Sequence, residues 1–127
     1  MIDHVSIAVR DLDAMGRFYE AVLHTLGYRK LRVAASTLGF GKPYPEFWLN
    51  HRPGTAPPPA DSGHHVCLRA PDMKAVEAFH AAALQAGGSS DGAPGLRPEY
   101  SEGYYAAFVR DPEGNRIEAV TFLKGPR

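Results

Sequence analysis

A chain of 127 residues, 44% hydrophobic and 22% charged, has enough apolar surface for a core and is close to the usual size of one domain. Fourteen basic residues balance fourteen acidic ones, which excludes an electrostatic signature for nucleic acid or an anionic membrane and favours a small-molecule partner. The single cysteine cannot form an intramolecular disulfide, and neither a bilayer-spanning apolar run nor a signal peptide is evident, so we expect a reduced, cytoplasmic setting.

The first half of the chain predicts a strand, a helix and further strands, in that order. Residues 5–9 alternate between an apolar face and a face that carries His4 and Ser6. Asp11 is expected to cap a helix that ends at Gly27. The apolar stripe of this helix comprises Leu12, Met15, Phe18, Val22 and Leu26. Residues 28–33, 36–40 and 46–50 follow as candidate strands.

The second half predicts the same sequence of elements after a proline-rich connection at residues 51–63. A strand begins at His65, and Asp72 caps a helix that Gly87 and Gly88 end. The stripe of the second helix comprises Met73, Val76, Phe79, Ala83 and Leu84. Strands at 104–110 and 116–122 flank a hairpin turn at 111–115. Residues 87–103 are expected to form a long irregular loop that shapes access to the site.

These two halves form an internal repeat. A shift of 61 residues superimposes eight identities between His4 and Gly27, including both histidines and both helix caps. The pattern predicts an α+β fold of two βαβββ modules in one domain spanning residues 1–127. Module one covers about residues 1–51, the connection about 52–63 and module two about 64–127. The helices should cover one face of the sheet, which leaves both histidines on the other face.

Four segments resemble the vicinal oxygen chelate superfamily, which includes glyoxalase I, extradiol dioxygenases, fosfomycin-modifying thiol transferases and bleomycin-resistance proteins. They are Asp-His-Val-Ser-Ile-Ala-Val-Arg-Asp at the start, the Phe-Tyr pair at 18–19, the second His-Val at 65–66, and Asp-Pro-Glu-Gly-Asn-Arg-Ile-Glu at 111–118. The resemblance covers essentially the whole chain. It implies that the two modules form a U-shaped mixed-sheet cleft.

The resemblance also implies one divalent metal ion, held by His4, His65 and Glu118. Matching residues 47–49 with residues 117–119 places Trp48 where glyoxalase I has a glutamate, and Glu46 is too far along the strand to replace it easily. A histidine at a strand start can equally form a local hydrogen bond, but two at equivalent positions favour a ligand role. Two imidazoles and a carboxylate suit Fe(II) or Mn(II) first, with Zn(II) or Ni(II) as alternatives.

A metal enzyme acting on a small substrate with vicinal oxygens is the function that this reading predicts, of dioxygenase, lyase or isomerase, or thiol-transferase type. No catalytic acid or base is identified. The residues expected to bind substrate are Trp48, Arg69, Arg97, Tyr100 and Tyr105. A homodimer is implied by the resemblance. The alternative is a metal-free binding protein of the bleomycin-resistance type, which Trp48 favours because an indole can stack on a ligand.

Overall fold

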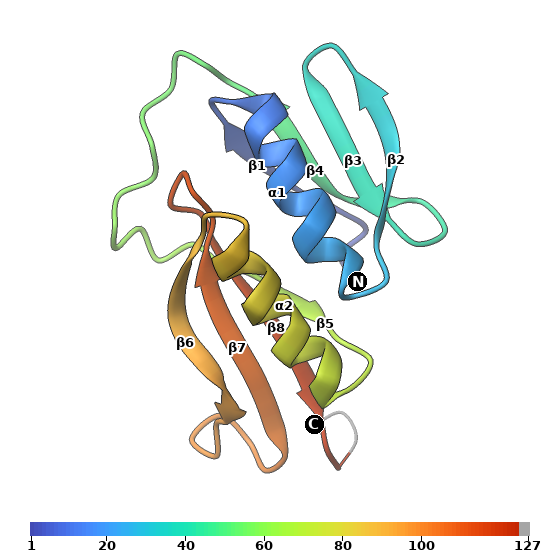
Figure 1. Ribbon diagram of the computed structural model, residues 1–127, viewed down its shortest axis with the longest axis vertical. Coiled ribbons are helices and arrows are strands. Elements are labelled where there is room, and N and C mark those ends of the chain that lie inside the picture. Colours follow the sequence, from blue (N-terminus) through green and yellow to red (C-terminus); the bar gives the residue numbers. More distant parts are fainter. Residues whose placement is uncertain (125–127) are drawn as a thin grey trace.

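The computed structural model describes residues 1–124 and divides them into two modules with the same order of elements (Figure 1). Module one consists of β1 (Val5–Val9), α1 (Leu12–His24), β2 (Arg29–Ala34), β3 (Thr37–Gly41) and β4 (Pro45–His51). Module two consists of β5 (Val66–Arg69), α2 (Met73–Gln85), β6 (Ser89–Leu96), β7 (Tyr104–Arg110) and β8 (Arg116–Phe122). The predicted α+β class and its two βαβββ modules are therefore confirmed.

Each module has its own four-stranded mixed sheet. Sheet one has the order β1-β4-β3-β2, and sheet two has the matching order β5-β8-β7-β6. The first and last strands of each module pair in parallel, and the remaining neighbours are antiparallel. The last strand of each module therefore lies between the first strand and the third strand of that module. Its side chains have neighbours on both of these strands.

Both helices begin at the predicted aspartates. The Asp11 carboxylate accepts a hydrogen bond from the Ala14 amide at 3.0 Å, and Asp72 accepts one from the Ala75 amide at 2.9 Å. Most of the predicted apolar stripes are buried. Met73 and Leu84 are exceptions and are 39% and 44% exposed. They lie at the edges of the side of α2 that faces the sheet.

One continuous core joins the modules. The two helices lie side by side on the same side of both sheets (Figure 1). Side chains from α1, α2 and the facing sides of both sheets form a single buried cluster. We call the other side of each sheet its open face. A second, smaller cluster lies on the open face of sheet two and comprises Tyr104, Ala106 and Val120, with Phe108 and Phe122 packed against them.

The segment 87–103 differs from its prediction. Residues Ser89–Leu96 form β6 and pair antiparallel with β7, so the expected long loop is reduced to residues 97–103. The pairing skips between Ser90 and Gly92 and again between Gly92 and Gly95. Pro94 lies within the second irregularity, where a missing backbone N–H costs no ladder bond. Glycine, proline and bulges removed the alternating pattern by which a strand is normally detected.

The turn between β7 and β8 ties module two to module one. Asp111 is 3% exposed and accepts the Tyr19 hydroxyl of α1 at 2.6 Å. Glu113 accepts the backbone amides of Arg10 and Asp11 at 2.8 and 2.9 Å, next to the start of α1. The predicted hairpin turn therefore also fixes how the modules sit against each other. Within residues 1–124, neither helix is long and apolar enough to cross a membrane.

Candidate functional site

A groove runs across the open face of sheet two and has a volume of about 630 Å³. Its walls come from three neighbouring strands and the loop before β7. The lining side chains are His65, Cys67, Arg69, Tyr100, Tyr104, Phe108, Glu118, Val120 and Phe122. Since side chains alternate along a strand, the groove residues of β7 and β8 are all at even-numbered positions, which share the open face. The groove therefore combines titratable groups at one end with an aromatic floor.

Glu118 is the buried polar centre of the groove. It lies in the middle of β8, opposite Cys67 of β5 and Phe108 of β7, and is only 2% exposed. Its Oε1 is 3.0 Å from the His65 Nε2, and its Oε2 accepts a hydrogen bond from the Tyr104 hydroxyl at 2.5 Å. Both carboxylate oxygens thus have a partner, as a buried carboxylate requires. The side chain of His65 remains 48% exposed, so the imidazole is accessible from the groove.

Tyr104 is held as a hydrogen-bond donor. Burial raises the pKa of Tyr104 above its ordinary value, and the hydrogen bond to Glu118 and the nearby Cys67 thiol raise this pKa further. The hydroxyl consequently keeps its proton under ordinary conditions. It also fixes the orientation of the Glu118 carboxylate, because it binds the oxygen that does not face His65.

His65 and Glu118 are suited to a divalent cation by donor type and by spacing. An imidazole nitrogen and a carboxylate oxygen are ordinary ligands, and two donors each about 2.1 Å from one ion lie about 3 to 3.4 Å apart in octahedral or tetrahedral coordination. The 3.0 Å separation of Nε2 and Oε1 matches that spacing. Both atoms coordinate a cation only in their deprotonated forms, so cation binding would displace the proton of the hydrogen bond between them.

His4 is not brought to this pair within one chain. It lies just before β1, where its Nδ1 is 2.8 Å from the Asp3 carboxylate and its side chain is 54% exposed. His4 and His65 face one smaller hollow, which Glu46 also lines. Among residues 1–124, however, no three histidine, cysteine, aspartate or glutamate side chains are arranged to hold a metal ion. The predicted third ligand therefore stands apart from the other two.

Module one places an aromatic ring where module two has its carboxylate. Trp48 lies opposite Ser6 as Glu118 lies opposite Cys67, and this register confirms the predicted match between the two strands. The indole lies over Gly39, where an added Cβ would come within 2.8 Å of the ring. Trp48 lines a separate hollow on sheet one with Arg32 and others, outside the groove of sheet two.

Only two of the other predicted substrate-binding residues line the groove. Arg69 and Tyr100 do, whereas Arg97 stacks its guanidinium over the Phe108 ring at 5.4 Å and donates to the Ala93 carbonyl. The prediction for Tyr105 was wrong, because Tyr105 does not line the groove. Its side chain points to the helix side of sheet two, where the hydroxyl donates to Glu77 of α2 at 2.8 Å.

Tyr104 takes the place predicted for Tyr105. The two tyrosines are adjacent in a strand, so only one can face the groove. The hairpin turn could have identified Tyr104 from the sequence. Pairing β7 with β8 across this turn puts Phe108 opposite Glu118, and Tyr104 lies on the same face as Phe108. Phe108, Val120 and Phe122 could have been assigned to the groove by the same step.

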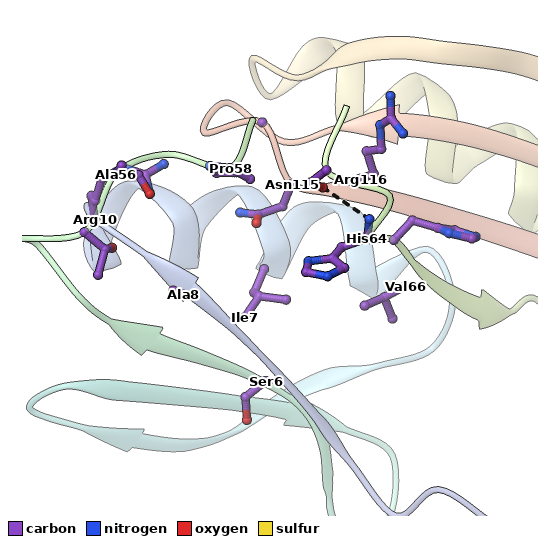
Figure 2. Close-up of a pocket in the computed structure, with 14 residues that line it drawn as sticks. Ser6, Ile7, Ala8, Arg10, Ala56, Pro58, His64, Val66, Asn115 and Arg116 are labelled. Atoms are coloured by element: carbon purple, nitrogen blue, oxygen red, sulfur yellow. Dashed lines mark hydrogen bonds between the residues drawn. The ribbon is translucent and has the colours of Figure 1, made fainter. Parts of the chain in front are cut away.

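A second hollow, of about 390 Å³, lies between β1, the connection between the modules and the turn before β8 (Figure 2). Two arginines line it, and both hold parts of the chain together. Arg10 forms an ion pair with Glu113 at 2.9 Å, and Arg116 donates to the Ala60 carbonyl at 3.0 Å. Both arginines of this hollow therefore help to hold the connection and the turn in place.

Comparisons with known proteins agree with this geometry. A family model for the Glyoxalase/Bleomycin resistance protein/Dioxygenase superfamily matches residues 1–119. A glyoxalase/bleomycin resistance protein from Albidiferax ferrireducens T118 is 31% identical with a TM-score of 0.81, over 93% of this chain and 96% of that one. A comparison with curated proteins gave no match.

Two more distant structures share the fold. A glyoxylase/bleomycin resistance protein/dioxygenase domain from Frankia sp. EAN1pec is 19% identical with a TM-score of 0.73, over 96% of this chain and 97% of that one. A mutant of glyoxalase I from Zea mays is 23% identical with a TM-score of 0.68, over 92% of this chain and 44% of that one.

Proposed function

The chain belongs to the glyoxalase/bleomycin resistance protein/dioxygenase superfamily, and we propose that it is a divalent-metal-dependent enzyme acting on a small substrate that coordinates through oxygen. The reaction is of dioxygenase, lyase or isomerase, or thiol-transferase type. The observation that carries this proposal is the contact between His65 and Glu118, two ordinary metal ligands whose donor atoms meet at 3.0 Å in the wall of a groove.

Each groove residue has a separate task in this proposal. His65 and Glu118 hold the cation, Tyr104 orients Glu118 by its hydrogen bond, and the aromatic floor receives the body of the substrate. A bound divalent cation supplies Lewis-acid polarisation of a substrate oxygen. Fe(II) or Mn(II) suits a nitrogen and oxygen donor set with open positions, and Zn(II) or Ni(II) is the alternative.

His4 is proposed as the third ligand, contributed by a second copy of the chain. In a homodimer that joins the open face of sheet one to the open face of sheet two of its partner, His4 of the partner subunit would reach the pair formed by His65 and Glu118. This arrangement is supported by the separation of His4 from that pair within one chain and by the small apolar cluster on the open face of sheet two. A cytoplasmic setting, expected from the single cysteine, is also a proposal.

Metal content after anaerobic reconstitution tests the metal proposal. We expect wild-type protein incubated with Fe(II), Mn(II), Zn(II) or Ni(II) and desalted to retain close to one ion per site by mass spectrometry. His65→Ala should lose that ion, whereas the matched control His64→Ala, which alters the neighbouring exposed histidine, should keep it. Equal metal content in wild type and His65→Ala would refute the proposal.

Subunit mixing tests where His4 acts. His4→Ala and Glu118→Gln should each lose the metal as pure dimers. In random mixed dimers of the two variants, a site shared between subunits would regenerate one intact site per mixed dimer, or about a quarter of the wild-type metal content. A site built within one chain would regenerate none, and the dimeric part of the proposal would then be abandoned.

The second candidate is a metal-free protein that sequesters a small apolar ligand. The observation that favours it is the hydrogen-bonded state of Glu118, whose two oxygens are satisfied by His65 and Tyr104 without a cation. Ligand binding that is unchanged by a chelator, together with protein that takes up none of the four metals, would support this candidate over the enzyme.

A further inference from the structure

Arg69 is the cation of the groove and differs from the arginines that hold the fold together. It follows Cys67 on the open side of β5, and its guanidinium lies over the Phe122 ring at 4.9 Å. Within residues 1–124, no carboxylate or carbonyl binds this guanidinium. By contrast, Arg110 and Arg116 both face Asp91, and Arg10 pairs with Glu113.

The contact with Phe122 holds the guanidinium without using its hydrogen-bond donors. A guanidinium over an aromatic face is attracted by the ring, while its five N–H groups in the plane stay available. The ring therefore fixes where the positive charge lies, and the exposed fork faces the groove. A planar fork matches the two oxygens of a carboxylate.

The floor between Arg69 and Glu118 is apolar and aromatic. Tyr104 contacts Phe122 edge to face with ring centroids 5.4 Å apart, and Tyr100 contacts Tyr104 in the same way at 5.2 Å. Val120 lies between Glu118 and Phe122 on the same face of β8. Tyr104, Val120 and Phe122 belong to the second cluster outside the main core, which is a surface suited to a flat apolar molecule.

Arg69 and Glu118 lie toward opposite ends of the groove. Arg69 pairs with Val120 in the sheet and reaches Phe122, two and four residues beyond Glu118. At about 3.3 Å per residue, the cation lies roughly 7 to 13 Å from the carboxylate. Without a bound metal, an anionic group of a ligand is attracted to Arg69 and repelled from Glu118, which favours one orientation of the ligand.

We infer that the groove binds a small molecule with a flat apolar body and a single carboxylate, and that Arg69 is the residue that binds this carboxylate. The inference deepens the proposed function and rests on it for the place of the reacting end, because the oxygen-bearing end of the ligand would then lie at His65 and Glu118. It assigns Arg69 to recognition of the charged end of the ligand, away from the metal ligands.

A matched pair of probes tests the inference. Binding of 2-naphthoate and of its neutral counterpart 2-naphthamide would be measured by calorimetry and ligand-observed NMR, with a chelator present so that no metal contributes. We expect wild-type protein to bind the carboxylate at least about tenfold more tightly than the amide, since a charge-assisted bidentate bond is lost in the amide. High salt should reduce this ratio, because the guanidinium is exposed.

Variants assign the effect to Arg69. Arg69→Gln should bring the ratio to about one, and measurable binding of naphthamide to this variant would show that the groove is folded. Arg69→Lys should give an intermediate ratio, because it keeps the charge and loses the fork. The control Arg17→Gln, which removes the same charge from the exposed side of α1, should keep the wild-type ratio.

Three results would overturn the inference: a wild-type protein that binds neither probe, equal binding of both probes, or a preference for the carboxylate that survives in Arg69→Gln. These outcomes are independent of the metal experiment. A protein that takes up no metal and still prefers the carboxylate through Arg69 retains the inference and loses the proposed function. A metal-binding protein without this preference does the reverse.

Discussion

The two modules share their framework and differ in what they place on it. Each has a parallel pair of first and last strands, and each helix is capped by an aspartate three residues before the amide that it accepts. At equivalent positions, module one presents Trp48 over Gly39 and module two presents Glu118 beside Phe108. The repeated pattern therefore preserves the fold, while single substitutions on the open faces decide where polar chemistry can occur.

A second feature of module two is the turn that precedes its last strand. The turn before β8 carries Asp111, which accepts hydrogen bonds from the Tyr19 hydroxyl, the Glu113 and Asn115 amides and the Asn115 side chain, at 2.6 to 2.9 Å. This turn holds module two against α1 of module one. The site of module two thus lies on a strand that follows a turn fixed by buried polar contacts.

The largest effect should come from removing that turn's carboxylate. Asp111→Ala leaves the Tyr19 hydroxyl and the turn amides without their acceptor, so we expect a loss of about 3 kcal/mol or more in the free energy of unfolding. Chemical denaturation measures it. Glu102→Ala, which removes only an exposed ion pair with Lys124, is the control and should change little. A loss below about 1 kcal/mol would show that the turn does not hold the modules together.

The contact between Trp48 and Gly39 can be disrupted by adding a side chain at residue 39. A Cβ at residue 39 would meet the indole at 2.8 Å and Pro45 at 3.0 Å, so Gly39→Ala should cost about 2 kcal/mol and shift the fluorescence of the single tryptophan. Gly54→Ala is the control, because an added Cβ there meets nothing within 4 Å. Unchanged stability and emission would mean that the indole does not rest on Gly39.

The hydrogen bond between Tyr19 and Asp111, which joins the modules, should make the free energy of unfolding depend on pH. Burial, followed by the charge of Asp111 and the hydrogen bond to it, raises the pKa of Tyr19 well above 10.0. Because the unfolded tyrosine ionises near its ordinary pKa, the contribution of Tyr19 is complete below pH 10 and is lost as the pH rises toward the folded pKa. Tyr19→Phe should cost about 1.5 kcal/mol at pH 7.

The same variant should lose less stability than wild type between pH 10 and pH 11, and unfolding curves measured across this range test the point. Parallel pH dependence in the two proteins would contradict the assignment, since the remaining tyrosines titrate equally in both.

The helix caps should show the smallest effects and the closest agreement between modules. Asp11→Ala and Asp72→Ala each remove one acceptor from a helix amide at nearly the same distance, so each should cost about 1 kcal/mol. Thermal unfolding of the two variants gives the comparison. A cost at one cap more than twice that at the other would show that the modules differ in their framework as well as in their open faces.

Local patterns allowed much of this structure to be predicted. Alternation, helical spacing and the 61-residue repeat gave both helices, their caps and most strands, and the strand match gave the equivalence of Trp48 and Glu118. β6 was missed because Gly92, Pro94 and Gly95 remove its alternation and its ladder is irregular. The position of His4 relative to His65 could not be predicted, because contacts between the modules, rather than any local pattern, decide it.

Metal content compared between Glu118→Gln and Trp48→Phe tests the central claim most directly, because these variants alter equivalent positions of the two modules. After reconstitution with Mn(II) or Fe(II), we predict that Trp48→Phe retains the metal of the wild type and that Glu118→Gln loses it. Circular dichroism of both variants would verify that they are folded. A Glu118→Gln protein that holds as much metal as wild type would contradict the assignment of the site to module two.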